Sequence, residues 1–199
     1  MPTTKRRGKV RRAPTGQIFQ LKVTLRGVKV PIWRTVHVPG EVTMRQLHEI
    51  LQLTMGWQNA HLYEFRVDGV SYGEPDAEFD TEASDARRFR LARLAPTPGA
   101  QFIYLYDFGD GWEHEVVVEK ILPPEPRVRY PLCLAGRGAC PPEDVGGPWG
   151  YEEFLAAIRD PGHEQHDEML EWAGGLFDPE LFDVRSTNEA FDLYGIAVR

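Results

Sequence analysis

A short segment with the sequence YDFGDGWEH places two carboxylates and a histidine within eight residues, at Asp107, Asp110 and His114. Carboxylate oxygens and an imidazole nitrogen can bind a divalent metal ion, or serve as acid and base in catalysis. The Asp110-Gly111 pair also favours a tight turn. A structural interpretation, in which His114 fills space beside Trp112, therefore stays open.

A second polar group follows Cys133 and Cys140, in a segment that is rich in glycine and proline. This composition predicts a tightly turned loop from Cys133 to Gly150 that presents Glu143 and Asp144. Six residues separate the cysteines, whereas structural zinc sites usually pair cysteines about two to four residues apart. The spacing favours a buried thiol pair beside turn-forming acids over a zinc site.

His61 ends the segment WQNAH, directly after a predicted helix. Alone it is typical of a hydrogen-bonded turn residue, and it joins the acids only if its loop folds over the end of the sheet. The residues that we expect to line a cleft are His61, Asp107, Asp110, Trp112, His114, Glu143 and Asp144, and the candidate metal ligands among them are Asp107, Asp110 and His114. No glycine-rich loop is followed by a lysine at P-loop spacing, so a divalent metal is the cofactor considered and a nucleotide cofactor is not expected.

The elements that must position these residues begin with two predicted strands. Apolar and polar residues alternate over Phe19–Leu25, and Ile32–Val38 has strand character between two prolines. Apolar residues then recur at helical spacing over Thr43–Met55, with capping-box spacing at its start and Gly56 as its C-cap. Further strands are predicted at Leu62–Val67, Val70–Tyr72, Phe102–Tyr106 and Trp112–Ile121, with a surface loop over residues 73–88.

This order predicts an α+β fold with a β-grasp-like mixed sheet, one helix across it and an extension by a hairpin. We expect residues 17–199 to form a single domain, with the sheet core at 17–122 and a small helical subdomain at 123–199. In the subdomain, helices are predicted around Tyr151–Ile158, at His166–Ala173 and after Asp178-Pro179, and Ser186 with Glu189 again has capping-box spacing.

Charge divides the chain into a basic start and an acidic remainder. The formal net charge is −7, yet residues 1–13 hold six basic residues and no acidic one. These are Lys5, Arg6, Arg7, Lys9, Arg11 and Arg12. Such a segment can contact nucleic-acid phosphates, although a solvated, disordered tail over residues 1–16 is the more common interpretation. The acidic remainder disfavours a broad nucleic-acid-binding face.

Composition also limits the location of the protein. No apolar run reaches the roughly 18 residues that a membrane span needs, and no apolar stretch follows the basic start as in a secretory signal peptide. Two cysteines are too few for a disulfide framework. We therefore expect a cytoplasmic protein with no membrane partner, whose partner is a protein or a nucleic acid.

The motifs together resemble the plasmid pRiA4b ORF-3-like family. The resemblance rests on FQLKVTL at 19–25, PIWR at 31–34, Leu47-His48, Gly56-Trp57, His61, YDFGDGWEH at 106–114, CPPED at 140–144, Gly146-Gly147 and Gly150-Tyr151. It covers roughly residues 17–183, and it implies an association with plasmids and insertion elements but no particular activity. Many relatives have a cysteine before the two glycines, where this chain has Val145, which argues against a thiolate metal site.

We interpret the chain as a non-enzymatic binding or accessory module of a mobile-element-associated family. One alternative is a metal-dependent hydrolase or nuclease, in which the acids hold the ion and His114 or His61 moves a proton. Another is DNA binding through the basic tail alone. Convergence of the acids would favour the enzyme, and a steep salt dependence would favour the tail.

Overall fold

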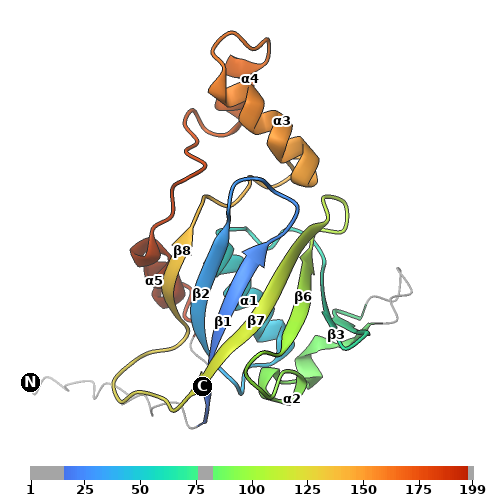
Figure 1. Cartoon of the computed structure of the whole chain (residues 1–199), viewed down its shortest axis with the longest axis vertical. Helices are drawn as coiled ribbons and strands as arrows, with labels where there is room; N and C mark the ends of the chain where they lie inside the picture. The colour runs from blue at the N-terminus through green and yellow to red at the C-terminus, as the bar shows by residue number, and fades with distance from the viewer. Residues whose placement is uncertain (1–15, 76–82, 197–199) are drawn as a thin grey trace, which may run out of the picture.

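The computed structural model describes residues 16–75 and 83–196 of the chain. An eight-stranded sheet runs through it in the order β5-β4-β3-β6-β7-β1-β2-β8 (Figure 1). The strands are β1 (Ile18–Leu25), β2 (Trp33–Pro39), β3 (Tyr63–Val67), β4 (Val70–Gly73), β5 (Ser84–Asp85), β6 (Gln101–Tyr106), β7 (Trp112–Leu122) and β8 (Leu132–Arg137). Neighbouring strands are antiparallel except β4 and β5. The six basic residues of the tail lie outside the described residues, so their contact with nucleic acid stays a prediction.

The strand predicted from the alternation at residues 19–25 is confirmed, because β1 pairs with β2 on one side and with β7 on the other. Phe19, Leu21 and Val23 all point into the core, as the period of two requires. On β7, Trp112 and His114 lie on the buried face together with Val116 and Val118. The centre of the sheet is therefore formed by strands whose sequences show clear alternation.

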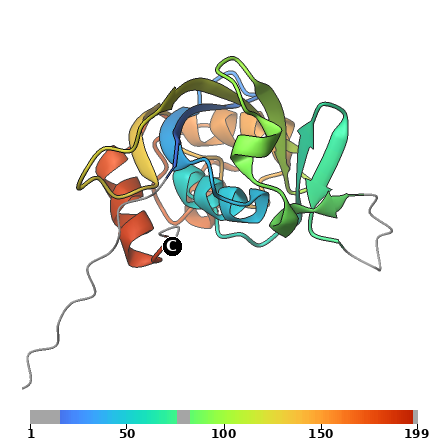
Figure 2. The same ribbon diagram turned by 90° about the horizontal axis from the view of Figure 1, so that it is seen from below.

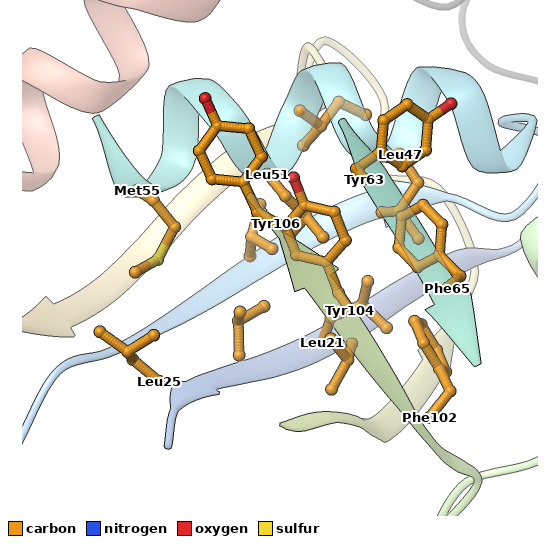
Figure 3. Close-up of a cluster of buried hydrophobic side chains, with 14 of the residues drawn as sticks. Leu21, Leu25, Leu47, Leu51, Met55, Tyr63, Phe65, Phe102, Tyr104 and Tyr106 are labelled. Atoms are coloured by element: carbon orange, nitrogen blue, oxygen red, sulfur yellow. The ribbon is translucent and has the colours of Figure 1, made fainter. Parts of the chain in front are cut away.

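The helix α1 (Met44–Met55) lies across one face of the sheet (Figure 2). Thr43 is its N-cap, with both hydrogen bonds of a capping box formed to Gln46, and Gly56 ends it in a left-handed conformation. Figure 3 shows Leu47 and Leu51 of α1 in one cluster with the aromatic side chains of β3 and β6. Burial of this apolar stripe fixes the helix on the sheet.

The mixed α+β class is confirmed, whereas the β-grasp pairing itself stays a prediction. The β6–β7 hairpin lies in the middle of the sheet, between β3 and β1. The segments predicted as loops also contain regular structure. Residues 73–88 include β5 and a 3-10 turn, η1 (Ala86–Arg88), and the short helix α2 (Leu91–Leu94) follows. The expected loop from Cys133 to Gly150 includes β8 and the start of a helix, which leaves residues 138–146 as the loop.

The C-terminal part contains α3 (Gly147–Arg159), α4 (His166–Trp172) and α5 (Val184–Leu193). Figure 1 shows α3 and α4 together at one end of the molecule and α5 beside β8. Two predicted helix starts are wrong. Asp178 caps a turn through the amide of Glu180, and the next helix begins only after Asp183, whose side chain accepts a hydrogen bond from the Arg185 amide. Ser186 lies within the first turn of α5 and donates to Asp183.

Among the described residues, no helix is long and apolar enough to cross a lipid bilayer.

Candidate metal-binding site

Three potential metal ligands meet at one end of the sheet: His61, Asp107 and Asp144. One donor atom from each lies within 4.8 Å of the other two. The Nε2 atom of His61 is 3.0 Å from Asp144 Oδ1 and 3.6 Å from Asp107 Oδ2. His61 follows α1, Asp107 follows β6 and Asp144 lies in the loop before α3, so three separate connections build the cluster.

His61 Nε2 is buried, and among residues 16–75 and 83–196 it has no hydrogen-bond partner, despite the close carboxylate oxygens. If Nε2 is unprotonated, its lone pair and those of the carboxylates are mutually repulsive. A cation placed between them would turn this repulsion into attraction, because all three atoms are then ligands. The arrangement suits a cation better than a hydrogen-bonded turn.

Asp107 is held in place by its own backbone and by the turn that follows it. Its φ of 56° lies in the left-handed region, and its amide donates to Leu62 O at 2.9 Å. Its Oδ1 accepts from the amides of Gly109 (2.9 Å) and Asp110 (3.3 Å). The other carboxylate oxygen, Oδ2, is the one that approaches His61. The side chain is about nine-tenths buried, so its carboxylate has little access to water.

Glu143 lies next to the three donor residues, with its Oε2 atom 3.9 Å from His61 Nε2. The Tyr106 hydroxyl donates to this carboxylate, at 3.1 Å from Oε1, and accepts from the Ala60 amide at 3.0 Å. The Gln58 amide also donates to Glu143 Oε1, at 2.8 Å. Glu143 is therefore anchored to the segment that carries His61. Burial raises the pKa of Tyr106 above its ordinary value, and the Glu143 charge adds to this, so the phenol stays protonated.

Asp110 does not join the three donors. Its Oδ2 accepts a hydrogen bond of 3.1 Å from the Gly146 amide. The backbone of Gly147 packs so closely on the carbonyl group of Asp110 that a Cβ atom would lie 2.3 Å from its oxygen. Asp110 thus joins the β6–β7 hairpin to the loop that carries Asp144, and its carboxylate is used for that contact.

His114 and Trp112 also lie away from the cluster, since both are fully buried in the core. His114 Nδ1 is 3.1 Å from Tyr104 O, and the ring meets Trp57 edge-on. Burial lowers the pKa of His114 to about 4. The structure therefore places a neutral core histidine here, and His61 occupies the position that the sequence-based hypothesis gave to His114.

The cysteines lie on either side of the turn after β8, and both are free thiols. Burial raises the pKa of Cys133 to about 11 and the pKa of Cys140 well above its ordinary value. The thiolate is the form that binds metals and attacks electrophiles. Protonated thiols fit a structural role for the two cysteines, of which Cys133 is buried and Cys140 partly exposed.

Two residues near the site, Tyr106 and Asn59, were not among the predicted cleft residues. Tyr106 was detectable in principle, because a buried tyrosine hydroxyl needs a partner and polar loops were expected at that end of the strand. Asn59 carries only a weak signal, since asparagine tolerates the left-handed conformation that it adopts here (φ 58°).

A family profile, a relative in sequence and a solved structure were found to be similar to this chain. The profile of the plasmid pRiA4b ORF-3-like protein family matches residues 17–186. The uncharacterized protein y4hQ of Sinorhizobium fredii (strain NBRC 101917 / NGR234) is 47% identical over 177 residues, which is 88% of this chain and 91% of that protein. The crystal structure of MM3350, a protein of unknown function from Methanosarcina mazei Go1, superposes with a TM-score of 0.77 at 35% identity, covering 85% of this chain and 96% of the other.

Proposed function

The chain belongs to the plasmid pRiA4b ORF-3-like family, and from this premise we propose that it is a binding module that holds a divalent metal ion. The ligands are His61 Nε2, Asp107 Oδ2 and Asp144 Oδ1, with Glu143 as a fourth ligand or a neighbouring base. The observation that carries the proposal is the convergence of the three donor atoms within 4.8 Å. We also propose the association with mobile elements and the cytoplasmic location that the sequence indicates.

Charge supports the same proposal. Three carboxylates surround one imidazole, and two of them, on Asp107 and Glu143, are mostly shielded from water. Like charges a few ångströms apart repel more strongly when water is excluded from around them, because the local dielectric constant is lower. One imidazolium charge cannot balance three carboxylates, whereas a divalent cation bound through the lone pair of His61 Nε2 balances two of them and leaves one negative charge for a partner. A set of one nitrogen and several oxygen ligands suits zinc or manganese.

Isothermal titration calorimetry of the full chain with Zn²⁺ and with Mn²⁺ tests this proposal, after treatment with a chelator. We expect about one ion per chain, and loss of that binding in His61→Ala and Asp107→Asn. Matched controls are His163→Ala and Asp167→Asn, which make the same two substitutions in and just before α4, far from the cluster in the sequence. Lack of binding by the wild-type chain, or binding that survives His61→Ala, would overturn the proposal.

A metal-dependent hydrolase or nuclease is the second candidate, and Glu143 is the observation that favours it. Its carboxylate lies beside the proposed ion, is fixed by Tyr106 and Gln58, and is 13% exposed. Such a carboxylate can accept a proton from a metal-bound water.

The enzyme hypothesis is tested with the Zn²⁺- or Mn²⁺-loaded chain on bis(4-nitrophenyl) phosphate and on single- and double-stranded DNA. Turnover that disappears in Glu143→Gln, while the ion stays bound, would favour an enzyme. Binding of the ion without turnover on these three substrates would favour the binding module.

A further inference from the structure

We propose that a buried polar network of four residues positions His61 for the metal ion. The network consists of His48 and Gln52 on α1, Tyr104 on β6 and Asn59 in the segment that connects α1 to His61. These are positioning residues, because none of them is among the proposed ligands. The inference rests on the proposed function, since it concerns the geometry of the same site.

The four side chains form a continuous hydrogen-bonded path beneath the His61 segment. His48 Nδ1 is 2.8 Å from the Tyr104 hydroxyl, and His48 Nε2 is 2.6 Å from Asn59 Oδ1. Gln52 Nε2 donates to the same Tyr104 hydroxyl at 2.9 Å. Gln52 Oε1 accepts a hydrogen bond from the backbone amide of Asn59 at 2.9 Å, which closes the circuit.

The donors and acceptors of this circuit run in one direction. Asn59 Oδ1 can only accept, so His48 Nε2 carries the proton and donates to it. His48 Nδ1 then accepts from the Tyr104 hydroxyl, which in turn accepts from Gln52 Nε2. Burial lowers the pKa of His48 to about 4, which keeps the ring neutral and Nδ1 free to accept. The ring also stacks on Tyr63, with centroids 3.6 Å apart and planes 7° apart.

Asn59 is thereby held by both its amide and its side chain, in a left-handed backbone conformation with a φ of 58°. The next two amides, of Ala60 and His61, point to the Tyr106 hydroxyl at 3.0 and 3.4 Å. His61 follows Asn59 by only two residues. Its direction is consequently set by the network on one side and by Tyr106 on the other.

The test compares two variants that break the circuit, Tyr104→Phe and Asn59→Gly, with the control Tyr63→Phe. Glycine adopts the left-handed conformation freely, so Asn59→Gly removes the side-chain bond without adding backbone strain. Within the described part of the chain, the buried Tyr63 hydroxyl has no hydrogen-bond partner, so its removal breaks no bond although the ring touches His48. All three changes leave the proposed ligands intact.

Two measurements are made on each full-length variant: Zn²⁺ affinity by calorimetry, and amide hydrogen exchange by NMR in the metal-free protein. For Tyr104→Phe and Asn59→Gly we expect affinity to fall by about 10- to 100-fold, as for loss of outer-shell partners of metal ligands. We also expect faster exchange at the amides of Ala60 and His61 than at those of the β1–β2 hairpin. A purely structural role would speed exchange across the whole sheet instead. Tyr63→Phe should change neither quantity.

Unchanged Zn²⁺ affinity in both circuit variants would overturn the inference, and so would uniformly faster exchange. Failure of the wild-type chain to bind Zn²⁺ or Mn²⁺ would instead overturn the proposed function. In that case the exchange rates of Ala60 and His61 still decide whether the network holds this segment. The two failures are therefore distinguishable.

Discussion

The guanidinium group of Arg34 donates a hydrogen bond of 2.8 Å to the carbonyl oxygen of Gly138, where β8 has ended and the acidic loop begins. The same group donates to carbonyl oxygens of Arg137, Trp33 and Thr54, and the ring of Phe182 covers it at 3.8 Å. Within the described part of the chain no carboxylate forms an ion pair with it. A buried cation, held by carbonyl groups from α1, β2 and β8, therefore fixes the start of the loop that carries Glu143 and Asp144.

We expect Arg34→Lys to lower the free energy of unfolding by about 2–4 kcal/mol, because an ammonium group cannot replace the planar fork of donors and leaves buried carbonyl groups unpaired. Urea denaturation measures this change. The matched control is Arg26→Lys, whose side chain is half exposed, and its effect should stay within about 0.5 kcal/mol. Equal stability of the two variants would show that the Arg34 bonds contribute little.

The contact between Gly147 and Asp110 should tolerate no side chain. Gly147 has a φ of 70°, and a Cβ atom there would lie 2.3 Å from the carbonyl oxygen of Asp110. Gly174 has a φ of 87° and open space around it. In Gly174→Ala we expect only the cost of the left-handed conformation, about 1–2 kcal/mol, and in Gly147→Ala a further 1–3 kcal/mol for the clash. Chemical denaturation of both variants compares the two costs, and a similar loss in both would argue against a rigid contact.

Stability should decrease as the pH is lowered from about 6.5 to about 4. Burial lowers the pKa values of His48 and His114 from 6.5 to about 4 in the folded chain. Between these pH values the unfolded chain binds more protons than the folded one, so the free energy of unfolding rises with pH. The contribution of the two histidines to it is complete above pH 6.5. Each histidine contributes up to about 3 kcal/mol to this change.

His114→Phe tests the pH dependence, since it keeps a ring in the core and removes the titrating group. We expect a smaller loss of stability between pH 7 and pH 4 than in the wild-type chain, measured by urea denaturation at a series of pH values. Contributions from carboxylates are shared by both proteins and cancel in the comparison. An identical pH dependence would mean that His114 is not the buried titrating group.

The start of α1 should depend on the side-chain oxygen of Thr43. This oxygen accepts from the Gln46 amide at 3.2 Å, and the Thr43 amide donates to Gln46 Oε1 at 2.9 Å. Thr43→Ala should reduce stability by about 1 kcal/mol, whereas Thr43→Ser keeps the oxygen and most of the stability. Thermal unfolding of the two variants tests the difference. Equal melting temperatures would show that the cap is dispensable.

The strand β1 and the start of α1 were predicted correctly from local patterns. The alternation of Phe19, Leu21 and Val23 requires only that one face of the strand is buried, and the cap at Thr43 is formed by residues three positions apart. In contrast, β8 was read as part of a loop. Its sequence, LCLAGR, has no regular alternation, and it becomes a strand because β2 pairs with it and Asn188 of α5 bonds both the amide and the carbonyl group of Cys133.

The kinds of ligand available at the site can be read from the sequence: carboxylates after β6, carboxylates before α3, and a histidine after α1. The sequence also contained the reason to exclude His114, whose place on the alternating face of Trp112 and Val116 directs it into the core. The meeting of His61 with Asp107 and Asp144, in contrast, follows from the packing of the folded chain. Their loops are distant in the chain, and contacts such as Asp110 with Gly146 and Tyr106 with Glu143 are needed to bring them together. Such contacts depend on how strands and helices pack, which no local pattern of residues encodes.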